Sequence, residues 1–342
     1  MQNHEFYMQR CLDLAKKGIG NVSTNPMVGS VIVFNNQIIG EGYHKKYGES
    51  HAELNAISSV KNKKLLCKST LYVNLEPCAH IGKTPACSDL IIKSKIPKVV
   101  IGCLDTHKKV CGNGIKKMND SGIEIILGVL EKESREINKR FFTFNEEKRP
   151  YVILKWAKSK DGYIAPKKQN GPFWMTNLKS KKIVHKWRSE EDAILIGRVT
   201  AEKDNPFLTV RETYGKNPTR VVIDRKLKLS EKLNLFNNDA ETIIFNEQIS
   251  KRNDKHIYTR IKFDTPIINI IHKLYLLNIQ SIIVEGGEKT IQSFIDSNLW
   301  DEARIFTTKI SLTNGIKSPI INLIPSKKRT LDNDFLEIFY ND

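Results

Sequence analysis

The chain has 342 residues, of which 40% are hydrophobic and 27% charged, and its formal net charge is +17 at pH 7. This composition is typical of a soluble globular protein with room for two domains. No apolar stretch approaches the roughly 18 residues that cross a bilayer, and the N-terminus "MQNHEFYMQR" lacks the apolar run of a signal peptide. We therefore expect a cytoplasmic protein without membrane contact, whose six cysteines stay reduced.

The positive charge has two interpretations. A nucleic-acid-binding surface would gather lysine and arginine into a stripe with interleaved aromatic residues. Here the lysine pairs are scattered, and lysine, asparagine and isoleucine are frequent along the whole chain. We interpret the charge chiefly as solvated surface; attraction of an anionic partner, such as a phosphorylated small molecule, is the other interpretation.

The first half of the chain alternates predicted strands and helices. Residues 4–17 have helical apolar spacing, and "VGSVIVF" and "QIIGEGY" predict a hairpin that turns at Asn35-Asn36. A helix is expected near "HAELNAISSV", and "STLYVNL", "KVVIGC" and "IEIILG" predict strands, with helices at 85–94 and in "GIKKMNDSG" between them. This alternation predicts an α/β sheet covered on both faces.

A charged helix at 130–147 leads to Lys148-Arg149-Pro150, where proline favours a boundary before a new strand. We therefore expect two α/β domains, 1–147 and 148–342. The second half again alternates between the two kinds of element. Its expected strands are 151–157, 192–197, 219–224, 241–245 and 280–284, and its expected helices are 177–188, 265–277 and 289–296.

The stretch "LEPCAHIGKTPACSDL" contains two cysteines that could be a disulfide, two buried thiols or two metal ligands. The expected reducing compartment argues against a disulfide. A catalytic zinc generally has three protein ligands and leaves the fourth position for water, and Cys78 and Cys87 supply two thiolates. His51 is the best third ligand, because zinc nucleotide deaminases pair an H-x-E sequence with a later P-C step. In that arrangement Glu53 is no ligand; it carries a proton from the activated water to the departing amine.

The alternative to this metal site is a pair of buried thiols with a surface histidine. His80 is a competing ligand, which we interpret instead as a substrate contact or a polar loop residue. The remaining cysteines are expected to be small core or surface residues. They are Cys11, Cys67, Cys103 and Cys111.

The interval between Cys78 and Cys87 discriminates among deaminases. Eight residues separate them, whereas many zinc deaminases, including those acting on nucleic acids, have a C-x-x-C sequence. The stretch "LEPCAHIGKTPAC", with "NPMVGSVIV" and "GEGYHKKYGESHAE" upstream, resembles the bifunctional riboflavin-biosynthesis deaminase-reductase family through much of the first 130 residues. The resemblance implies a cytidine-deaminase-like three-layer domain in which His51, Cys78 and Cys87 hold zinc and Glu53 is the proton shuttle.

The same resemblance implies that Asn25 contacts the pyrimidine, and it makes Lys83 a candidate for reaching a phosphate; an exposed loop lysine is the alternative. One departure follows the strand that ends at Cys103, where the family usually reads D-P-N-P-x-V-x-G-x-G. This chain has "DTHKKVCGNG" and lacks both prolines, so we expect a less rigid loop and unchanged metal chemistry. The family residues that it keeps are Asp105, Val110, Gly112 and Gly114.

The second half contains "SIIVEGGEKTIQSF", with two glycines between a predicted strand and a helix start. Such a turn lets backbone N–H groups approach a phosphate at the positive end of a helix, although a plain turn is the alternative. The G-x-G-x-x-G sequence of a Rossmann domain is absent. With "LKWAKSKDGYIA", "WMT", "DAILIGRVTAEKDNPFLTVR" and "TRVVIDRKLKL", this segment resembles the reductase half of the same family, which has a dihydrofolate-reductase-like fold and uses NADPH.

Carried over residue by residue, the resemblance implies two groups of contacts in the second half. The cofactor group comprises Lys158, Trp174, Thr200, Asp204 and the segment from Gly287 to Ser293, which includes Glu288, Lys289 and Thr290. The substrate group comprises Arg188, Leu208, Arg211 and Glu285, the two arginines being suited to phosphate. The alternatives for the single residues are core packing for Leu208 and Trp174 and surface salt bridges for the arginines; as an ordered set, the residues favour the site. Lys155 and Asp161 match the family pattern without an assigned role.

Two departures concern this half. Pro172 replaces a serine that usually precedes "xWIT", and Lys158 replaces an alanine; both are expected to weaken the reductase. The resemblance implies two consecutive steps of riboflavin synthesis on a phosphoribosylaminopyrimidine, by a homo-oligomer that binds no nucleic acid. The alternatives are a nucleic-acid deaminase with a basic C-terminal binding domain, and a non-catalytic zinc scaffold, which would have no need of Glu53.

Overall fold

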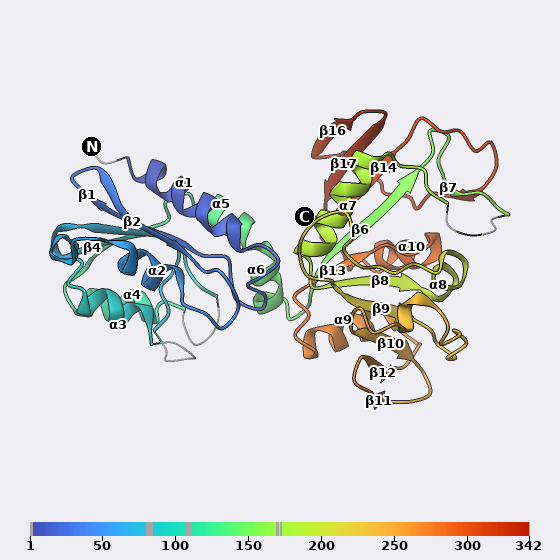
Figure 1. The fold of residues 1–342 in the computed structure, drawn as a ribbon, viewed down its shortest axis with the longest axis horizontal. Coiled ribbons are helices and arrows are strands. Elements are labelled where there is room, and N and C mark those ends of the chain that lie inside the picture. Colours follow the sequence, from blue (N-terminus) through green and yellow to red (C-terminus); the bar gives the residue numbers. More distant parts are fainter. Residues whose placement is uncertain (1–2, 80–84, 107–110, 169–170, 172, 342) are drawn as a thin grey trace. The chain divides into compact units, whose positions relative to one another are not determined.

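The computed structural model describes residues 3–79, 85–106, 111–168, 171 and 173–341. The chain forms two compact units, Met1–Glu147 and Lys148–Asp342 (Figure 1). The division falls at the first residue of the Lys148-Arg149-Pro150 segment. Among the described residues, no helix has the length and apolar character that a membrane crossing requires.

The first unit is built on a five-stranded sheet in which β3, β4 and β5 are parallel and β1 is antiparallel to both of its neighbours. The predicted hairpin is confirmed, because Asn35 and Asn36 have φ values of 47° and 61°, as a tight turn between β1 and β2 requires. In spatial order the strands are β2 (Gln37–Tyr43), β1 (Gly29–Phe34), β3 (Thr70–Leu75), β4 (Lys98–Cys103) and β5 (Glu124–Leu127).

Alternating strand residues of this sheet pack on opposite faces, which produces three layers. Val31, Tyr72 and Val100 contact helix α1 (His4–Ala15), while their neighbours Ile32 and Leu71 belong to the core on the other face. Figure 1 shows α1 and α5 (Glu131–Ile137) along one side of the sheet and further helices along the other. Those helices are α2 (Ala52–Ser59), α3 (Cys87–Lys93) and α4 (Asn113–Asp120), and the 3₁₀ turns are Lys16–Gly18 and Lys63–Lys68.

The prediction of a single helix at 130–147 is wrong, because two helices occupy this segment. They are α5 (Glu131–Ile137) and α6 (Lys139–Glu146), separated by Asn138. The Asn138 amide accepts from Met27 N at 2.7 Å and donates to Met27 O at 2.9 Å. This pair of buried bonds fixes Asn138 outside helical geometry, at φ −103° and ψ 17°, and thereby interrupts the helix.

The second unit contains a ten-stranded sheet, in which β12, β10, β9, β8, β13, β6 and β14 run parallel and β11, β17 and β16 run antiparallel to their neighbours. In spatial order the strands are β11 (Lys251–Arg252), β12 (His256–Arg260), β10 (Thr242–Asn246), β9 (Thr219–Ile223), β8 (Ala193–Gly197), β13 (Ser281–Val284), β6 (Tyr151–Lys158), β14 (Glu302–Thr307), β17 (Asp334–Tyr340) and β16 (Lys327–Leu331). A separate pair consists of β7 (Tyr163–Ala165) and β15 (Ile316–Lys317).

Helices cover both faces of this sheet. Ile267 and Ile270 of α9 and Ile291 of α10 belong to the core on one face. On the other face, Val184 of α7 and Ala201 of α8 pack against the sheet. The helices are α7 (Leu178–Glu190), α8 (Arg198–Asp204), α9 (Pro266–Leu276) and α10 (Glu288–Asp296), with a 3₁₀ turn at Asn234–Phe236.

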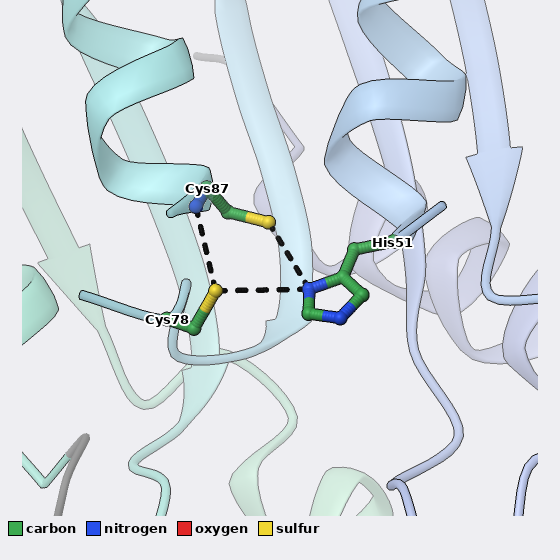
Figure 2. A group of neighbouring side chains, drawn as sticks. All are labelled: His51, Cys78 and Cys87. Carbon is green, nitrogen blue, oxygen red and sulfur yellow. Dashed lines mark hydrogen bonds between the residues drawn. The ribbon is translucent and has the colours of Figure 1, made fainter. Parts of the chain in front are cut away.

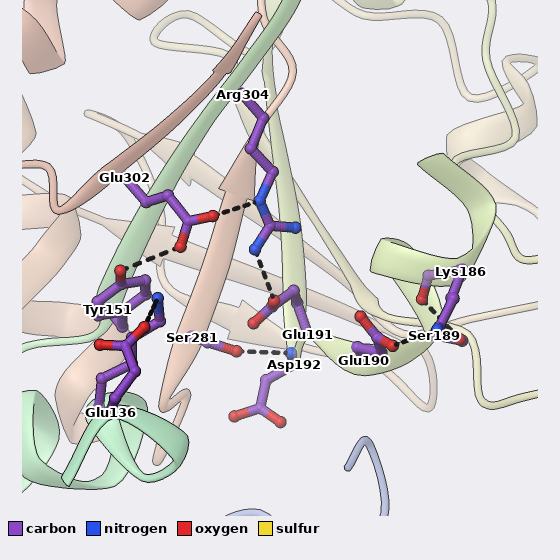
Figure 3. Close-up of polar contacts among 11 residues, drawn as sticks. Glu136, Tyr151, Lys186, Ser189, Glu190, Glu191, Asp192, Ser281, Glu302 and Arg304 are labelled. Carbon is purple, nitrogen blue, oxygen red and sulfur yellow. Dashed lines mark hydrogen bonds and ion pairs between the residues drawn. The ribbon is translucent and has the colours of Figure 1, made fainter. Parts of the chain in front are cut away.

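The sequence analysis did not predict β7, β11, β12 or the strands from β14 onward. For β14 the reason is its buried charges (Figure 3). Arg304 Nε donates to Glu302 Oε1 at 2.7 Å, and Arg304 Nη2 lies 3.7 Å from Glu191 Oε1. Tyr151 Oη donates to Glu302 Oε2 at 3.1 Å, and the guanidinium stacks 4.5 Å from the ring centroid of Trp187. A central strand that carries Glu302 and Arg304 inside the protein has no clean apolar pattern.

Candidate active sites

The candidate metal site lies where two helices begin beside the end of β3. His51 directly precedes α2, Cys87 is the first residue of α3, and Cys78 follows β3. His51 Nδ1 lies 3.6 Å from Cys78 Sγ and 3.3 Å from Cys87 Sγ, and the Cys87 N–H donates to Cys78 Sγ at 3.4 Å (Figure 2). The structure therefore brings the three predicted ligands together.

These distances fit a zinc ion. In a tetrahedral site with Zn–N about 2.0 Å and Zn–S about 2.3 Å, the nitrogen and sulfur ligands are about 3.5 Å apart. All three ligand atoms lie within 4.8 Å of one another. Hydrogen bonds from Cys87, and also from His51, hold the pKa of the Cys78 thiol well below its ordinary value, so this sulfur is readily available as a thiolate.

Glu53 lies in the first turn of α2, two residues after His51, and its side chain is 3% exposed. Burial, with a smaller contribution from the negative charge of Cys78, raises the pKa of this carboxyl to about 7. A carboxyl whose pKa lies near neutrality can both accept and release a proton under ordinary conditions. Glu53 thus has the properties of a proton carrier.

Asn25 is linked to the metal site by His44, a residue to which the sequence analysis gave no role. His44 contacts Asn25 and lies next to the predicted metal ligand His51. His44 Nδ1 lies 3.1 Å from the carbonyl oxygen of Ser50, which can only accept, so Nδ1 carries the proton. His44 Nε2 must then accept from the Asn25 amide nitrogen, 3.1 Å away. Burial lowers the pKa of His44, which favours this neutral form, and the His44 ring centroid lies 5.4 Å from that of His51. The hydrogen bond to Nε2 fixes the Asn25 side chain beside His44.

Glu76 is a second residue that the sequence analysis did not single out. It directly precedes Pro77-Cys78, and its side chain is buried. Its Oε1 accepts from the backbone N–H groups of Gly114 and Ile115 at 3.0 and 3.3 Å. Its Oε2 accepts from Gly112 N at 3.0 Å and, at 3.4 Å, from Asp105 N. One carboxylate therefore ties the metal-ligand loop to the start of α4.

We expect Glu76→Gln to loosen this connection. An amide would turn an NH₂ group toward backbone donors, which leaves buried groups unsatisfied at a cost of about 1–3 kcal/mol. Hydrogen exchange of peptides covering residues 111–116 should accelerate about tenfold or more. Glu124→Gln, which alters an exposed partner of Lys98, is the control and should leave this exchange unchanged. Equal exchange in Glu76→Gln and the wild-type protein would contradict the role given to this carboxylate.

Four residues considered in the sequence analysis lie outside the described residues: His80, Lys83, Val110 and Pro172. Of the kept family residues in the loop after β4, Gly112 and Gly114 contact Glu76 as given above. Gly112 has φ 75°, a left-handed conformation that suits glycine, and it directly precedes α4. A β-carbon on Gly114 would lie 2.0 Å from the carbonyl oxygen of Pro77, so this close approach requires glycine.

In the second unit, Arg188 and Glu285 form a buried bidentate ion pair. Arg188 Nε and Nη2 donate to the two Glu285 oxygens at 3.2 and 2.7 Å, and Lys155 Nζ lies 3.8 Å from Oε2. Although burial alone would raise it, the charges of Arg188 and Lys155 bring the pKa of Glu285 down to about 2. Burial lowers the pKa of Lys155, which Glu285 opposes. The predicted substrate residues Arg188 and Glu285 are thus together, and Lys155 joins them.

The other two predicted substrate residues belong to the loop after α8. Leu208 is buried in the core with Ile194 and Ile196, so its side chain has the core position given above as the alternative. Arg211 is exposed; its Nη1 donates to Thr209 Oγ1 at 3.0 Å, and its guanidinium lies 5.3 Å from the ring centroid of Phe207.

Several predicted cofactor residues surround the turn between β13 and α10. Thr200 Oγ1 accepts from Gly287 N at 3.0 Å, which joins α8 to this turn. A β-carbon on Gly286 would lie 2.8 Å from Thr290 Cβ, and one on Gly197 would lie 2.5 Å from Thr290 Oγ1, so Thr290 packs closely against both glycines. Glu288 and Lys289 begin α10, whose N-terminus offers backbone N–H groups to an anion, although Glu288 adds an opposing charge.

The remaining predicted cofactor residues are placed on separate elements. Lys158 ends β6, and Asp204 ends α8. Trp174 is 59% exposed, and Lys181 Nζ lies 5.5 Å from its ring centroid, so it is not a core residue. The Asp161 carboxylate accepts hydrogen bonds from Ser159 Oγ and from the backbone N–H groups of residues 312 and 313. These bonds hold the 312–313 segment beside the end of β6.

Two family models match the chain. The cytidine and deoxycytidylate deaminase zinc-binding region matches residues 1–103, and the RibD C-terminal domain matches residues 150–315. The riboflavin biosynthesis protein RibD of Aquifex aeolicus is 39% identical over 316 residues, which cover 91% of this chain and 88% of that protein. The same protein of Bacillus amyloliquefaciens is 37% identical over 92% of this chain and 86% of its own length. The chain belongs to the RibD family.

Solved structures agree with this membership. The diaminohydroxyphosphoribosylaminopyrimidine deaminase/5-amino-6-(5-phosphoribosylamino)uracil reductase of Thermotoga maritima is 39% identical, with a TM-score of 0.87 and 98% of each chain covered. RibD of Acinetobacter baumannii is 28% identical, with a TM-score of 0.89 and the same coverage.

Membership in the RibD family establishes the architecture and the chemistry of the two units. The first is a zinc-binding unit of the cytidine-deaminase type, and the second is a reductase unit with a dihydrofolate-reductase-like fold that uses NADPH. The predictions of fold class, of a bifunctional deaminase and reductase of riboflavin biosynthesis, and of both cofactors are confirmed. This membership is consistent with an enzyme that acts on a small molecule and involves no nucleic acid. The nucleic-acid deaminase alternative is therefore set aside.

Proposed function

We propose that this chain acts on 2,5-diamino-6-ribosylamino-4(3H)-pyrimidinone 5′-phosphate and catalyses two consecutive steps. The first unit replaces the 2-amino group by oxygen, consuming water and releasing ammonia. The second unit reduces the ribosyl group of that product to ribityl. The observation that carries the proposal is the donor set of His51, Cys78 and Cys87 beside the buried carboxyl of Glu53, in a chain whose second unit belongs to a reductase family.

His51, Cys78 and Cys87 would hold zinc, and the distances between their ligand atoms support this assignment. Bound zinc acts as a Lewis acid and lowers the pKa of a water molecule to about 7. Glu53 accepts the proton that this water gives up and delivers it to the amine that departs from the ring. Asn25, held by His44, presents its carbonyl oxygen to the pyrimidine and orients it for attack.

In the second unit, the residues around the β13–α10 turn would hold NADPH, among them Thr200, Gly287 and Thr290. Bound NADPH supplies the hydride that reduces the ribose carbon. Arg188 and Arg211 bind the substrate phosphate, for which guanidinium groups are suited. Glu285 orients Arg188 and contacts the sugar. The remaining cofactor contacts in this proposal are Lys158, Trp174, Asp204, Glu288 and Lys289. Leu208, whose side chain lies in the core, supports the loop that carries Arg211.

The same proposal includes a homo-oligomer in the cytoplasm. The free thiols of Cys78 and Cys87 support a location in the cytoplasm, because a reducing compartment keeps them available to the metal. Light scattering during size-exclusion chromatography measures the assembly, and a monomeric mass at the concentration used for assays would contradict it.

The test follows ammonia release and NADPH oxidation in one reaction of the purified chain with the phosphoribosylated diaminopyrimidinone, with and without a zinc chelator. The expected result is zinc-dependent ammonia release followed by NADPH loss. Supplying the deaminated intermediate to chelated protein should restore NADPH loss alone. Ammonia release without NADPH loss would contradict the second step and direct attention to Pro172 and Lys158. If folded, zinc-loaded protein gave no ammonia release and no NADPH loss, both proposed steps would be contradicted.

A further inference from the structure

Helix α7 holds the loop that carries Arg211 at two points. His185 Nδ1 accepts from the backbone N–H of Arg211 at 3.1 Å, and Lys181 Nζ pairs with Glu212 Oε1 at 2.7 Å. The same helix carries Arg188, one turn after His185. Two arginines that are separated in the chain are therefore placed through one helix, one by its own position and the other by a hydrogen bond to its backbone.

The side chains around this helix carry an excess of positive charge. Lys155, Arg188 and Arg211 are three cations, and Glu285 is the carboxylate that pairs with two of them. Lys181 and Glu212 compensate each other. Burial and the charge of Arg188 lower the pKa of Arg211, so these cations are close enough to repel one another. An anion with two negative charges, such as a phosphate monoester, balances the excess.

His185 is suited to hold Arg211 because it stays neutral. Its side chain is 1% exposed, and burial, together with the charges of Arg188 and Arg211, lowers its pKa to about 4. An unprotonated Nδ1 can accept the Arg211 N–H, whereas a protonated ring has two donors and no acceptor. A neutral acceptor also adds no charge to a site that already has an excess of cations.

We propose that His185 is a positioning residue of the reductase, which sets the affinity for the substrate phosphate by fixing the backbone of Arg211. The role of Arg211 itself rests on the proposed function. His185 does not touch the substrate; it determines where the guanidinium of Arg211 lies. Without this bond, the loop keeps the Lys181–Glu212 pair and the buried Leu208, so it stays attached to the protein while Arg211 loses its fixed position.

The test compares two variants of the full chain. His185→Leu removes the acceptor, whereas His185→Asn keeps an oxygen near the place of Nδ1. With the deaminated intermediate and saturating NADPH, we expect His185→Leu to raise KM about tenfold with little change in kcat. His185→Asn should stay within about threefold of the wild-type KM. Ammonia release by the first unit of the same preparation is the internal control and should be unchanged.

A double-mutant cycle separates positioning from a general structural effect. In an Arg211→Gln background, His185→Leu should raise KM no further, because the guanidinium that it positions is gone. Equal KM values in the Leu and Asn variants, a wild-type KM in His185→Leu, or an undiminished effect in the Arg211→Gln background would each overturn the proposal. If His185→Leu does not fold, His185→Gln, whose amide lies one bond farther from the backbone, replaces it with the same expectations.

A binding measurement distinguishes failure of this proposal from failure of the proposed function. Calorimetric titration with ribose 5-phosphate, the fragment of the proposed substrate that carries the phosphate, requires no turnover. Binding that weakens about tenfold in His185→Leu and recovers in His185→Asn supports the positioning role even if the wild-type protein reduces nothing. Binding that is equal in all three proteins overturns the positioning role even if the wild-type protein is fully active.

Discussion

Glu53→Gln is expected to reduce kcat for ammonia release by about 10²–10⁴-fold, because an amide cannot carry the proton from water to the leaving amine. The side chain keeps its size, and an uncharged group suits a position that is 3% exposed beside Cys78. Zinc content, measured by metal analysis, should therefore remain that of the wild-type protein. NADPH oxidation with the deaminated intermediate should also be unchanged.

Glu41→Gln is the matched control for this variant. Glu41 is a partly buried carboxylate of the same unit, paired with Arg10 at 2.6 Å, and it is no part of the metal site. It should keep wild-type ammonia release. A Glu53→Gln protein with full zinc content and more than about a tenth of wild-type turnover would show that the proton takes another route.

Glu285→Gln is expected to destabilise the second unit by about 3–5 kcal/mol, because Arg188 and Lys155 would keep buried charges without their carboxylate. All four tryptophans lie in this unit, at positions 156, 174, 187 and 300, so intrinsic tryptophan fluorescence follows its unfolding in urea. Reductase activity should also be lost, since the Arg188 guanidinium would no longer be held by two bonds. Ammonia release by the first unit should persist.

The control here is Glu247→Gln, which breaks an exposed pair with Arg225 in the same unit. Exposed pairs contribute about 0–1 kcal/mol, so this change should leave the unfolding midpoint nearly unmoved. Similar destabilisation by the two substitutions would mean that the Arg188–Glu285 pair is no more important for stability than a surface contact.

The metal site was predictable because its signals are local. His51 and Glu53 are two residues apart at a helix start. Cys78 follows a strand and Cys87 begins a helix, and apolar patterns reveal both elements. The hairpin at Asn35-Asn36 was predictable for the same reason, since the turn residues themselves require its backbone geometry.

The supporting contacts were not predictable because their partners are distant in the chain. Glu76 bonds backbone groups up to 39 residues away, His185 bonds a residue 26 positions away, and Asn138 reaches Met27 across 111 positions. Hydrogen bonds of this kind leave no periodic pattern in a sequence. Strand β14 was missed for a related reason: burial of Glu302 and Arg304 depends on partners that other strands and α7 supply.

The division of the chain into two units has a consequence for inheritance. Among the described residues, the metal site lies within Met1–Glu147, and the Arg188–Glu285 pair lies within Lys148–Asp342. A substitution confined to one of these sets of residues therefore leaves the side chains of the other set unchanged. We therefore expect two alleles with lesions in different units to complement each other in one cell, because each copy would supply the step that the other lacks.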